Sequence, residues 1–166
     1  ADVVPVRADE IFVEAVPEGF RPASVVRTQF LDRLEADAVV AVIDRLPDAT
    51  SAMAVVQVRV LGGAIARVPV DATAFAHRQR KLMVNVVAID FEPGRQVEHV
   101  PWVTDLAATL RGDQVAGAYI GFLEDEGEER VRAAYPNSTW DRLVEVKQKY
   151  DPGNLFRLNA NIPPGG

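Results

Sequence analysis

The stretch KLMVNVVAIDF, residues 81–91, is rich in β-branched and other apolar residues and carries one amide residue, Asn85, near its centre. This composition predicts a largely buried β-strand. An asparagine buried in such a strand needs a hydrogen-bond partner, because an unpaired amide in apolar surroundings lowers stability. Asn85 therefore either has a specific partner or bonds locally on an exposed edge, and both interpretations stay open.

Upstream of this run, AVVQVRVL at 54–61 alternates around Gln57 and Arg59, which predicts a second strand. The glycine pair at 62–63 then indicates a hairpin turn, with AIARVPV at 64–70 as the returning strand. The hairpin is the more natural interpretation of this pair, because a phosphate-binding loop would need a further glycine, a lysine or a helix start.

Apolar residues three and four positions apart predict helices within 31–46, 97–110, 131–135 and 140–150. VAGAYIGFL at 115–123 favours one more strand. The first thirty residues carry several prolines and are expected to form extended segments and turns. This order predicts an α+β fold, in which an antiparallel sheet has helices packed on one face.

The chain ends in a way that predicts a definite turn and not a loose tail. Pro152 and Gly153 occupy the second and third positions of Asp-Pro-Gly-Asn, as a type II turn requires, and Asn137 or Ser138 is the expected N-cap of the preceding helix. The residues that follow the turn are too apolar for a solvated tail. We place a domain boundary here, between residues 1–136 and a C-terminal helix and tail at 137–166.

Composition excludes several classes of function. A net charge of -6 argues against a nucleic-acid partner, and the absence of cysteine excludes disulfides and thiolate sites. Two histidines far apart predict no metal site. No apolar run is long enough for a membrane span, and no secretory signal is visible at the start, so we expect no membrane partner and a cytoplasmic location.

No self-contained catalytic motif is present. The acidic run at 124–126 favours a solvated helix start over an acid pair, and His77 favours a structural role over orienting a carboxylate. Tyr119 is flanked by Ala118 and Gly121, whose small size would leave space beside its ring for a flat ligand. A core tyrosine bonded to the backbone is an equal alternative.

Three ordered motifs resemble one family. RLVEVKQKYDPGNLFRLNANIPP at 142–164 resembles the C-terminal signature of the berberine-bridge-enzyme-like FAD-linked oxidases, with Ala160 in place of a glutamine. LGGAIARVPVDATAFAHR at 61–78 and GAYIGFLEDEGEERVRAAY at 117–135 resemble two further segments of the same family.

The resemblance implies that 1–136 are the C-terminal part of a substrate-binding domain, and that 137–166 are the C-terminal helix and tail typical of the family. In that domain an antiparallel sheet, backed by helices, lies over the flavin ring of FAD. The resemblance further implies that the last segment, with Leu155, Phe156, Leu158 and Ile162, returns to a flavin-binding module. The glycine-rich segments of that module have no counterpart in this sequence. We therefore expect FAD to be bound mainly by an N-terminal module that these residues do not encode. An apolar face left by its absence predicts self-association.

The resemblance also implies roles for individual residues. Tyr119 and Asn85 fall at or near catalytic positions, where a hydroxyl orients substrate or, if its pKa is lowered, takes a proton, and where an amide polarises or positions the substrate. Asn159 and Asn161 are expected near the cofactor, and Gln57 and Arg59 on a strand that contacts the small-molecule substrate.

The leading hypothesis is thus the C-terminal part of an FAD-dependent oxidoreductase that oxidises an alcohol, amine or sugar-type substrate by hydride transfer, inactive on its own. The alternative is a non-enzymatic module that binds a ligand or partner. Gly121 and Ala160 motivate this alternative, because both replace amide residues of the family motifs.

Overall fold

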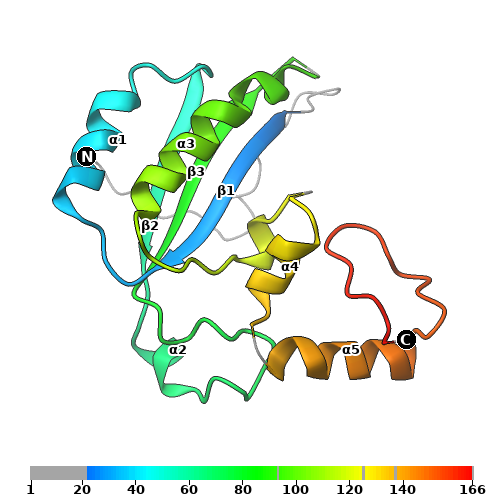
Figure 1. Ribbon diagram of the computed structural model, residues 1–166. Coiled ribbons are helices and arrows are strands. Elements are labelled where there is room, and N and C mark those ends of the chain that lie inside the picture. The colour runs from blue at the N-terminus through cyan, green and yellow to red at the C-terminus, as the bar shows by residue number, and fades with distance from the viewer. Residues whose placement is uncertain (1–21, 93, 125, 137, 166) are drawn as a thin grey trace, which may run out of the picture.

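The strand β3 (Leu82–Asp90) lies at the centre of a three-stranded antiparallel sheet, in agreement with the strand predicted at 81–91. β1 (Ala23–Leu31) and β2 (Met53–Val60) pair with its two sides. The computed structural model describes residues 22–165 except 93, 125 and 137. Figure 1 shows two helices, α1 and α3, along one face of the sheet, which confirms the α+β fold.

Four of the described α-helices follow the predicted periodicities, with small differences at their ends, while a fifth, at 64–67, stands where a strand was predicted. Their bounds are α1 Ala36–Arg45, α2 Ala64–Arg67, α3 Val100–Arg111, α4 Glu128–Ala134 and α5 Ser138–Tyr150, with 3-10 turns at η1 Arg95–His99 and η2 Ile120–Phe122. Pro101 stands in the first turn of α3, where a missing N–H costs nothing. The helix predicted from 31 begins at 36, because Leu31 still belongs to β1.

The hydrophobic core lies between the sheet and α3. Strand alternation turns Val84 and Val86 to this side, where they meet Val103 and Leu106, and all four side chains are fully buried. Trp102 Nε1 donates to the Arg45 carbonyl at 3.2 Å and ties α3 to α1. Truncating a core residue such as Leu106 to alanine costs about 2–5 kcal/mol. The opposite face of the sheet is therefore not covered by α1 or α3.

The hairpin predicted after β2 is wrong. Residues 64–67 form the short helix α2, and β2 pairs with β3 instead. Gly62 has φ 137° and Gly63 has φ 57°, so the glycines do supply positive φ, but they turn the chain away from the sheet. The chain comes back only at Lys81, whose carbonyl accepts from Leu61 N at 2.7 Å.

The strand predicted at 115–123 is also wrong. This segment touches β1 through one isolated bridge, in which Phe30 N donates to the Gly117 carbonyl at 3.3 Å, and it then forms η2. The alternation of small and large residues there serves packing against rings, as shown below. This segment forms no strand ladder along the outer edge of β1. Side chains of the acidic segment that follows contact this edge instead.

The turn after α5 is present but is not of type II. Asn154 N donates to the Asp151 carbonyl at 3.0 Å, while the left-handed residue is Asn154, with φ 50°, and not Gly153. Asparagine tolerates this conformation better than most residues. The N-cap expected at Asn137 and the segments expected within 1–21 lie outside the described residues. The domain boundary at 136/137 stays a prediction.

Candidate functional site

A cavity of about 580 Å³ opens on the face of the sheet that α1 and α3 leave free, and we call it the sheet-face pocket. Its floor is one row of residues paired across the three strands, Phe30, Met83 and Arg59. The loop from β2 to β3 and the segment around Tyr119 form its walls. The remaining lining residues are Leu61, Ile65, Ala74, Phe75, His77, Arg78, Ala118, Ile120, Ala134 and Tyr135.

Aromatic rings in edge-to-face contact build the pocket wall. The ring centroids of Phe30, Phe75 and Tyr119 lie 5.8–6.3 Å apart in T-shaped pairs, and Tyr119 also meets Phe122 at 5.4 Å. Such pairs add about 0.5–1.5 kcal/mol each beyond the burial of their area. The hydroxyl of Tyr119 makes no hydrogen bond to any described residue, so it is available to a ligand.

Gly121 explains the position of the Tyr119 ring. A Cβ at residue 121 would stand 2.8 Å from Tyr119 Cε1, so the ring lies where a larger side chain would be. Glycine at 121 therefore leaves the space that the Tyr119 ring takes in the pocket wall.

His77 stabilises the pocket wall by packing and by a hydrogen bond. Its ring stacks on Phe30 at 4.5 Å, and its Nε2 lies 3.1 Å from the Ala133 carbonyl, so Nε2 carries the proton and donates. Burial lowers the pKa of His77, so the ring is neutral near pH 7. The structural role predicted for His77 is confirmed.

Arg78 is buried, although arginine is usually exposed. It donates to the Ile65 carbonyl at 3.3 Å and to Thr73 Oγ1 at 2.6 Å, and its plane lies over Phe75. Its Nε is buried without a partner. Arg59, on the exposed end of β2, lies over the ring of Phe122 at 4.9 Å.

A second row of residues lies next to the pocket floor and is polar. Thr28, Asn85 and Gln57 are paired across the three strands, and Asn85 Nδ2 donates to Gln57 Oε1 at 3.1 Å. Asn85 therefore has the partner that a buried amide requires. However, Asn85 Oδ1 and Thr28 Oγ1 are both buried without a hydrogen bond. Polar atoms left unpaired in this way are uncommon and often mark a functional position.

The edge of β1 is covered by the acidic segment, and the solvated helix start predicted there is wrong. Glu124 accepts from Val26 N at 3.2 Å and from Ser24 Oγ at 3.1 Å. The Glu126 side chain, only 6% exposed, pairs with Arg130 at 3.1 Å and Arg27 at 3.5 Å. The free N–H groups of an edge strand and two nearby cations explain why these carboxylates turn inward.

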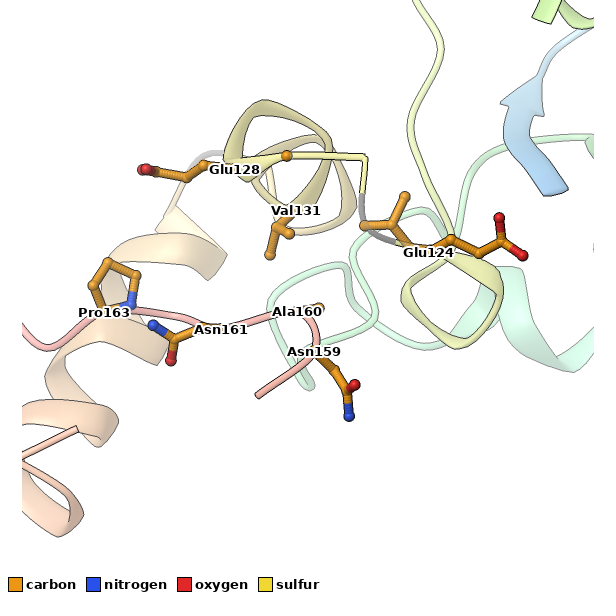
Figure 2. Close-up of a pocket in the computed structure, with 9 residues that line it drawn as sticks. Glu124, Glu128, Val131, Asn159, Ala160, Asn161 and Pro163 are labelled. Carbon is orange, nitrogen blue, oxygen red and sulfur yellow. The ribbon is translucent and has the colours of Figure 1, made fainter. Parts of the chain in front are cut away.

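A second cavity, of about 550 Å³, lies between α4 and the C-terminal tail. Figure 2 shows the tail passing below α4, with Val131 pointing toward Ala160 and Asn161. Asn159 takes a left-handed conformation with φ 59°, and Asn161 Oδ1 is buried without a partner. Asn159 and Asn161 thus share one cavity, apart from the lining of the sheet-face pocket.

A polar clasp holds the start of the tail against α5. Asp151 accepts from Leu155 N at 2.7 Å and Phe156 N at 3.0 Å, and Lys147 Nζ donates to Asp151 and to the Phe156 carbonyl. The side chains of Leu155, Phe156 and Leu158 remain 73%, 78% and 86% exposed. The tail therefore has a defined backbone path and an apolar surface without cover from the described residues.

The structure thus divides the six predicted site residues into three pairs. Tyr119 and Arg59 line the sheet-face pocket, Asn85 and Gln57 bond to each other in the row beside it, and the two tail asparagines line the second cavity. Sequence reasoning missed Arg78, Phe30 and Phe75. The stretch TAFAHR, with its aromatic and cationic residues, was the available signal.

Neither a membrane-spanning helix nor a metal-binding cluster is found among the described residues. None of the described helices is long and apolar enough to cross a bilayer. No group of three or more acidic or histidine side chains in residues 22–165, with the three gaps noted, is arranged to hold a metal ion.

Comparison with known proteins agrees with this geometry. Residues 118–163 match the family model described as berberine and berberine like. The chain is similar to an uncharacterized FAD-linked oxidoreductase, YgaK, of Bacillus subtilis, with 31% identity over 160 residues that cover 92% of this chain and 35% of the relative. It is also similar to berberine bridge enzyme-like 17 of Arabidopsis thaliana, with 30% identity over 62% of this chain and 22% of that protein.

Solved structures share the fold. The glycopeptide hexose oxidase DBV29, crystallised with teicoplanin, superposes with a TM-score of 0.75 at 27% identity, over 87% of this chain and 33% of that one. Berberine bridge enzyme from Eschscholzia californica superposes with a TM-score of 0.72 at 20% identity, over 87% and 33%.

The fold and the matched residues are similar to the C-terminal part of FAD-linked oxidoreductases. More specifically, this chain carries the C-terminal region of the berberine-bridge-enzyme-like FAD-linked oxidoreductases. It spans 35% of the length of YgaK, 22% of berberine bridge enzyme-like 17 and 33% of the DBV29 chain.

Proposed function

We propose that this chain is the substrate-side part of an FAD-dependent oxidoreductase that oxidises an alcohol, amine or sugar-type substrate, and that it is inactive without an FAD-binding module. The observation that carries the proposal is the sheet-face pocket. It is lined by Tyr119, whose hydroxyl makes no hydrogen bond to any described residue, and its floor adjoins a polar row in which the side-chain oxygens of Thr28 and Asn85 are buried and unpaired among the described residues. The oxidase structures that share the fold support it.

The side chains present fit one part of FAD and not another. The tail amides offer hydrogen-bond groups, and the buried unpaired oxygen of Asn161 suits an N–H donor such as that of a flavin ring. By contrast, the described residues contain no glycine-rich loop that opens a helix of useful length for a pyrophosphate. A partner module would therefore supply the phosphate site, while Asn159 and Asn161 contact the cofactor from this chain.

When bound, FAD would supply the hydride acceptor. Within this chain, the hydroxyl of Tyr119 would orient the substrate by a hydrogen bond, and only as the phenolate would it accept the hydroxyl or amine proton of the substrate. Asn85 and Gln57 would position the substrate by hydrogen bonds, since neither amide is a base at neutral pH. The exposed apolar side chains of the tail would lie against the partner module.

The first test is expression of a longer chain that includes the coding sequence upstream of Ala1. We expect the longer protein to be yellow with bound flavin and to lose that absorbance when a substrate is added without oxygen. The 166-residue chain should take up no stoichiometric FAD. Stoichiometric binding of FAD by the short chain would contradict the proposal, as would a longer chain that binds no flavin.

The second test separates Tyr119 from its neighbour in the same pocket. In the flavin-containing protein, Tyr119→Phe should slow flavin reduction by about 10²–10⁴-fold, the usual contribution of a positioned proton acceptor. Tyr135→Phe is the matched control. Burial raises the pKa of Tyr135, so its hydroxyl stays protonated and its removal should change the rate little. Equal effects of the two variants would remove Tyr119 from the mechanism.

A further inference from the structure

We infer that the sheet-face pocket takes a planar aromatic ligand that carries a carboxylate, and that Arg59 binds this carboxylate. The inference rests on the proposed function in one respect, because the ligand would be the substrate of the oxidation. The binding preference itself depends only on residues of this chain.

The shape and chemistry of the pocket walls favour an aromatic ring in the ligand. Phe30, Phe75 and Tyr119 present edges and faces to a cavity whose floor and sides also include Met83 and Ile65. A flat aromatic group can add to such a cluster by edge-to-face and offset-stacked contacts. A volume of about 580 Å³ accommodates a bicyclic ring with a substituent.

The charged side chains that line the pocket favour a ligand with a negative charge. The chain has a formal net charge of -6, yet the fourteen residues that line the pocket include Arg59 and Arg78 and no aspartate or glutamate. The third basic side chain, His77, is neutral because burial lowers its pKa. The pocket is thus a local cationic site on an acidic protein, which attracts anions and disfavours cations.

Among the described residues, none occupies the hydrogen-bonding groups of the Arg59 guanidinium. Its guanidinium lies on the ring of Phe122 and makes no ion pair or hydrogen bond with any other residue that the structure describes. Stacking on an aromatic face orients the guanidinium and leaves its edge N–H groups available. That edge matches the two oxygens of a carboxylate, which it can bind with two parallel hydrogen bonds.

Arg78 supplies an independent observation. It is 8% exposed, its hydrogen bonds go to neutral oxygens, and its Nε is buried without a partner. Buried cations in proteins are normally paired with anions, and across the described part of the chain no carboxylate pairs with this one. A bound anion in the same pocket would provide the missing negative charge.

The test compares two probes of the same shape with the 166-residue chain. Binding of 2-naphthoate and of the neutral 2-naphthamide is measured by calorimetry and by changes in the side-chain NMR signals of Phe75 and Tyr119. We expect 2-naphthoate to bind at least about tenfold more tightly, since hydrogen bonds to charged groups are the stronger ones. Equal affinities, preference for the amide, or no binding of 2-naphthoate would each overturn the inference.

Variants test whether Arg59 causes the preference for 2-naphthoate over 2-naphthamide. Arg59→Gln should remove the preference for 2-naphthoate and leave the affinity for 2-naphthamide within about twofold, while Arg59→Lys should keep part of it. Arg111→Gln is the matched control, because it removes an exposed arginine at the end of α3, outside the pocket lining. A preference that survives Arg59→Gln, or that Arg111→Gln also removes, contradicts the assignment.

The two proposals can fail separately. If 2-naphthoate binding depends on Arg59 but the longer protein binds no flavin, the oxidoreductase function fails and the anion pocket stands. If the longer protein binds flavin and a substrate reduces it, but 2-naphthoate and 2-naphthamide bind equally well, the carboxylate preference fails and the oxidoreductase function stands.

Discussion

The imidazole ring of His77 lies so close to the α-carbon of Gly117 that a methyl group on this glycine would stand 2.2 Å from His77 Cε1. Real carbon atoms do not approach this closely, and the ring has no easy escape. Its Nε2 bonds to Ala133, and its plane stacks on Phe30, which is itself fully buried. Glycine at 117 is therefore a requirement of the pocket wall.

Gly117→Ala should lower the free energy of unfolding by about 3 kcal/mol, because the added methyl displaces a ring held on both sides. Gly153→Ala is the control: Gly153 has no positive φ and no neighbouring atom within 4 Å, so its change should stay within about 0.5 kcal/mol. Urea denaturation measures both variants. A small effect at Gly117 would show that His77 can move at little cost.

Asn85→Leu should leave the free energy of unfolding within about 1 kcal/mol of the wild type, because it removes one hydrogen bond together with a buried unpaired oxygen. Thermal and urea unfolding check this. Asn85→Asp is the contrasting variant, and we expect it to cost about 3 kcal/mol by placing a carboxylate in a buried site without a cation.

The same Asn85→Leu variant, made in the flavin-containing protein, should slow flavin reduction while the fold persists. A polar residue retained at no gain in stability is typical of a functional position. A loss of several kcal/mol in Asn85→Leu would instead indicate that Asn85 is needed for the sheet.

Acid should open the clasp at the start of the tail. The hydrogen bond from Lys147, together with the N–H groups of Leu155 and Phe156, lowers the pKa of Asp151 below its ordinary value of 3.8. A lowered pKa in the folded state means that the contribution of the clasp is complete above this value and is lost as pH falls through the lowered pKa.

Amide NMR signals of Leu155 and Phe156 should therefore stay constant from neutral pH to about 4 and move at lower pH. Asp151→Asn should show weaker protection of both amides from hydrogen exchange at every pH. Asp48→Asn, at an exposed position, serves as control. Signals in the wild type that move only near neutral pH would exclude Asp151 as their cause.

The exposed tail should determine how the isolated chain associates. The paired change Phe156→Ser and Leu158→Ser removes two side chains that are 78% and 86% exposed, so we expect less self-association and a stability change within about 0.5 kcal/mol. Val115→Ser, at an 81% exposed valine elsewhere, should change neither. Light scattering and urea denaturation measure both properties. If the paired variant associates as strongly as the wild type, the surface responsible for self-association lies elsewhere in the chain.

The elements that could be predicted are those that a local period defines. The apolar runs of β2 and β3 and the stripe of α3 are each complete within a short window, so their types were predicted correctly. The glycine pair after β2 shows where this fails. Glycine marks a positive φ, but the turn that it makes depends on the β2–β3 pairing. This pairing joins residues from 22 (Val60 and Leu82) to 36 (Met53 and Ile89) positions apart.

The site shows the same limit. Tyr119 and Arg59 were predicted from a family resemblance, and the structure places both on one pocket, whereas strand register decides that Asn85 meets Gln57. The buried Arg78 could not be predicted from pattern, because an arginine after a loop is usually solvated. The inward turn of Glu124 likewise depends on the bare edge of β1, which a linear pattern does not reveal.

The clasp between Asp151 and the backbone of Leu155 and Phe156 has a thermodynamic consequence for any encounter with another surface. Ordering a loose peptide on contact costs about 1–2 kcal/mol for each residue whose backbone is immobilised. In this chain that loss has already occurred during folding, so the apolar side chains meet their counterpart preorganised. Most of the free energy of desolvating them would then appear as affinity.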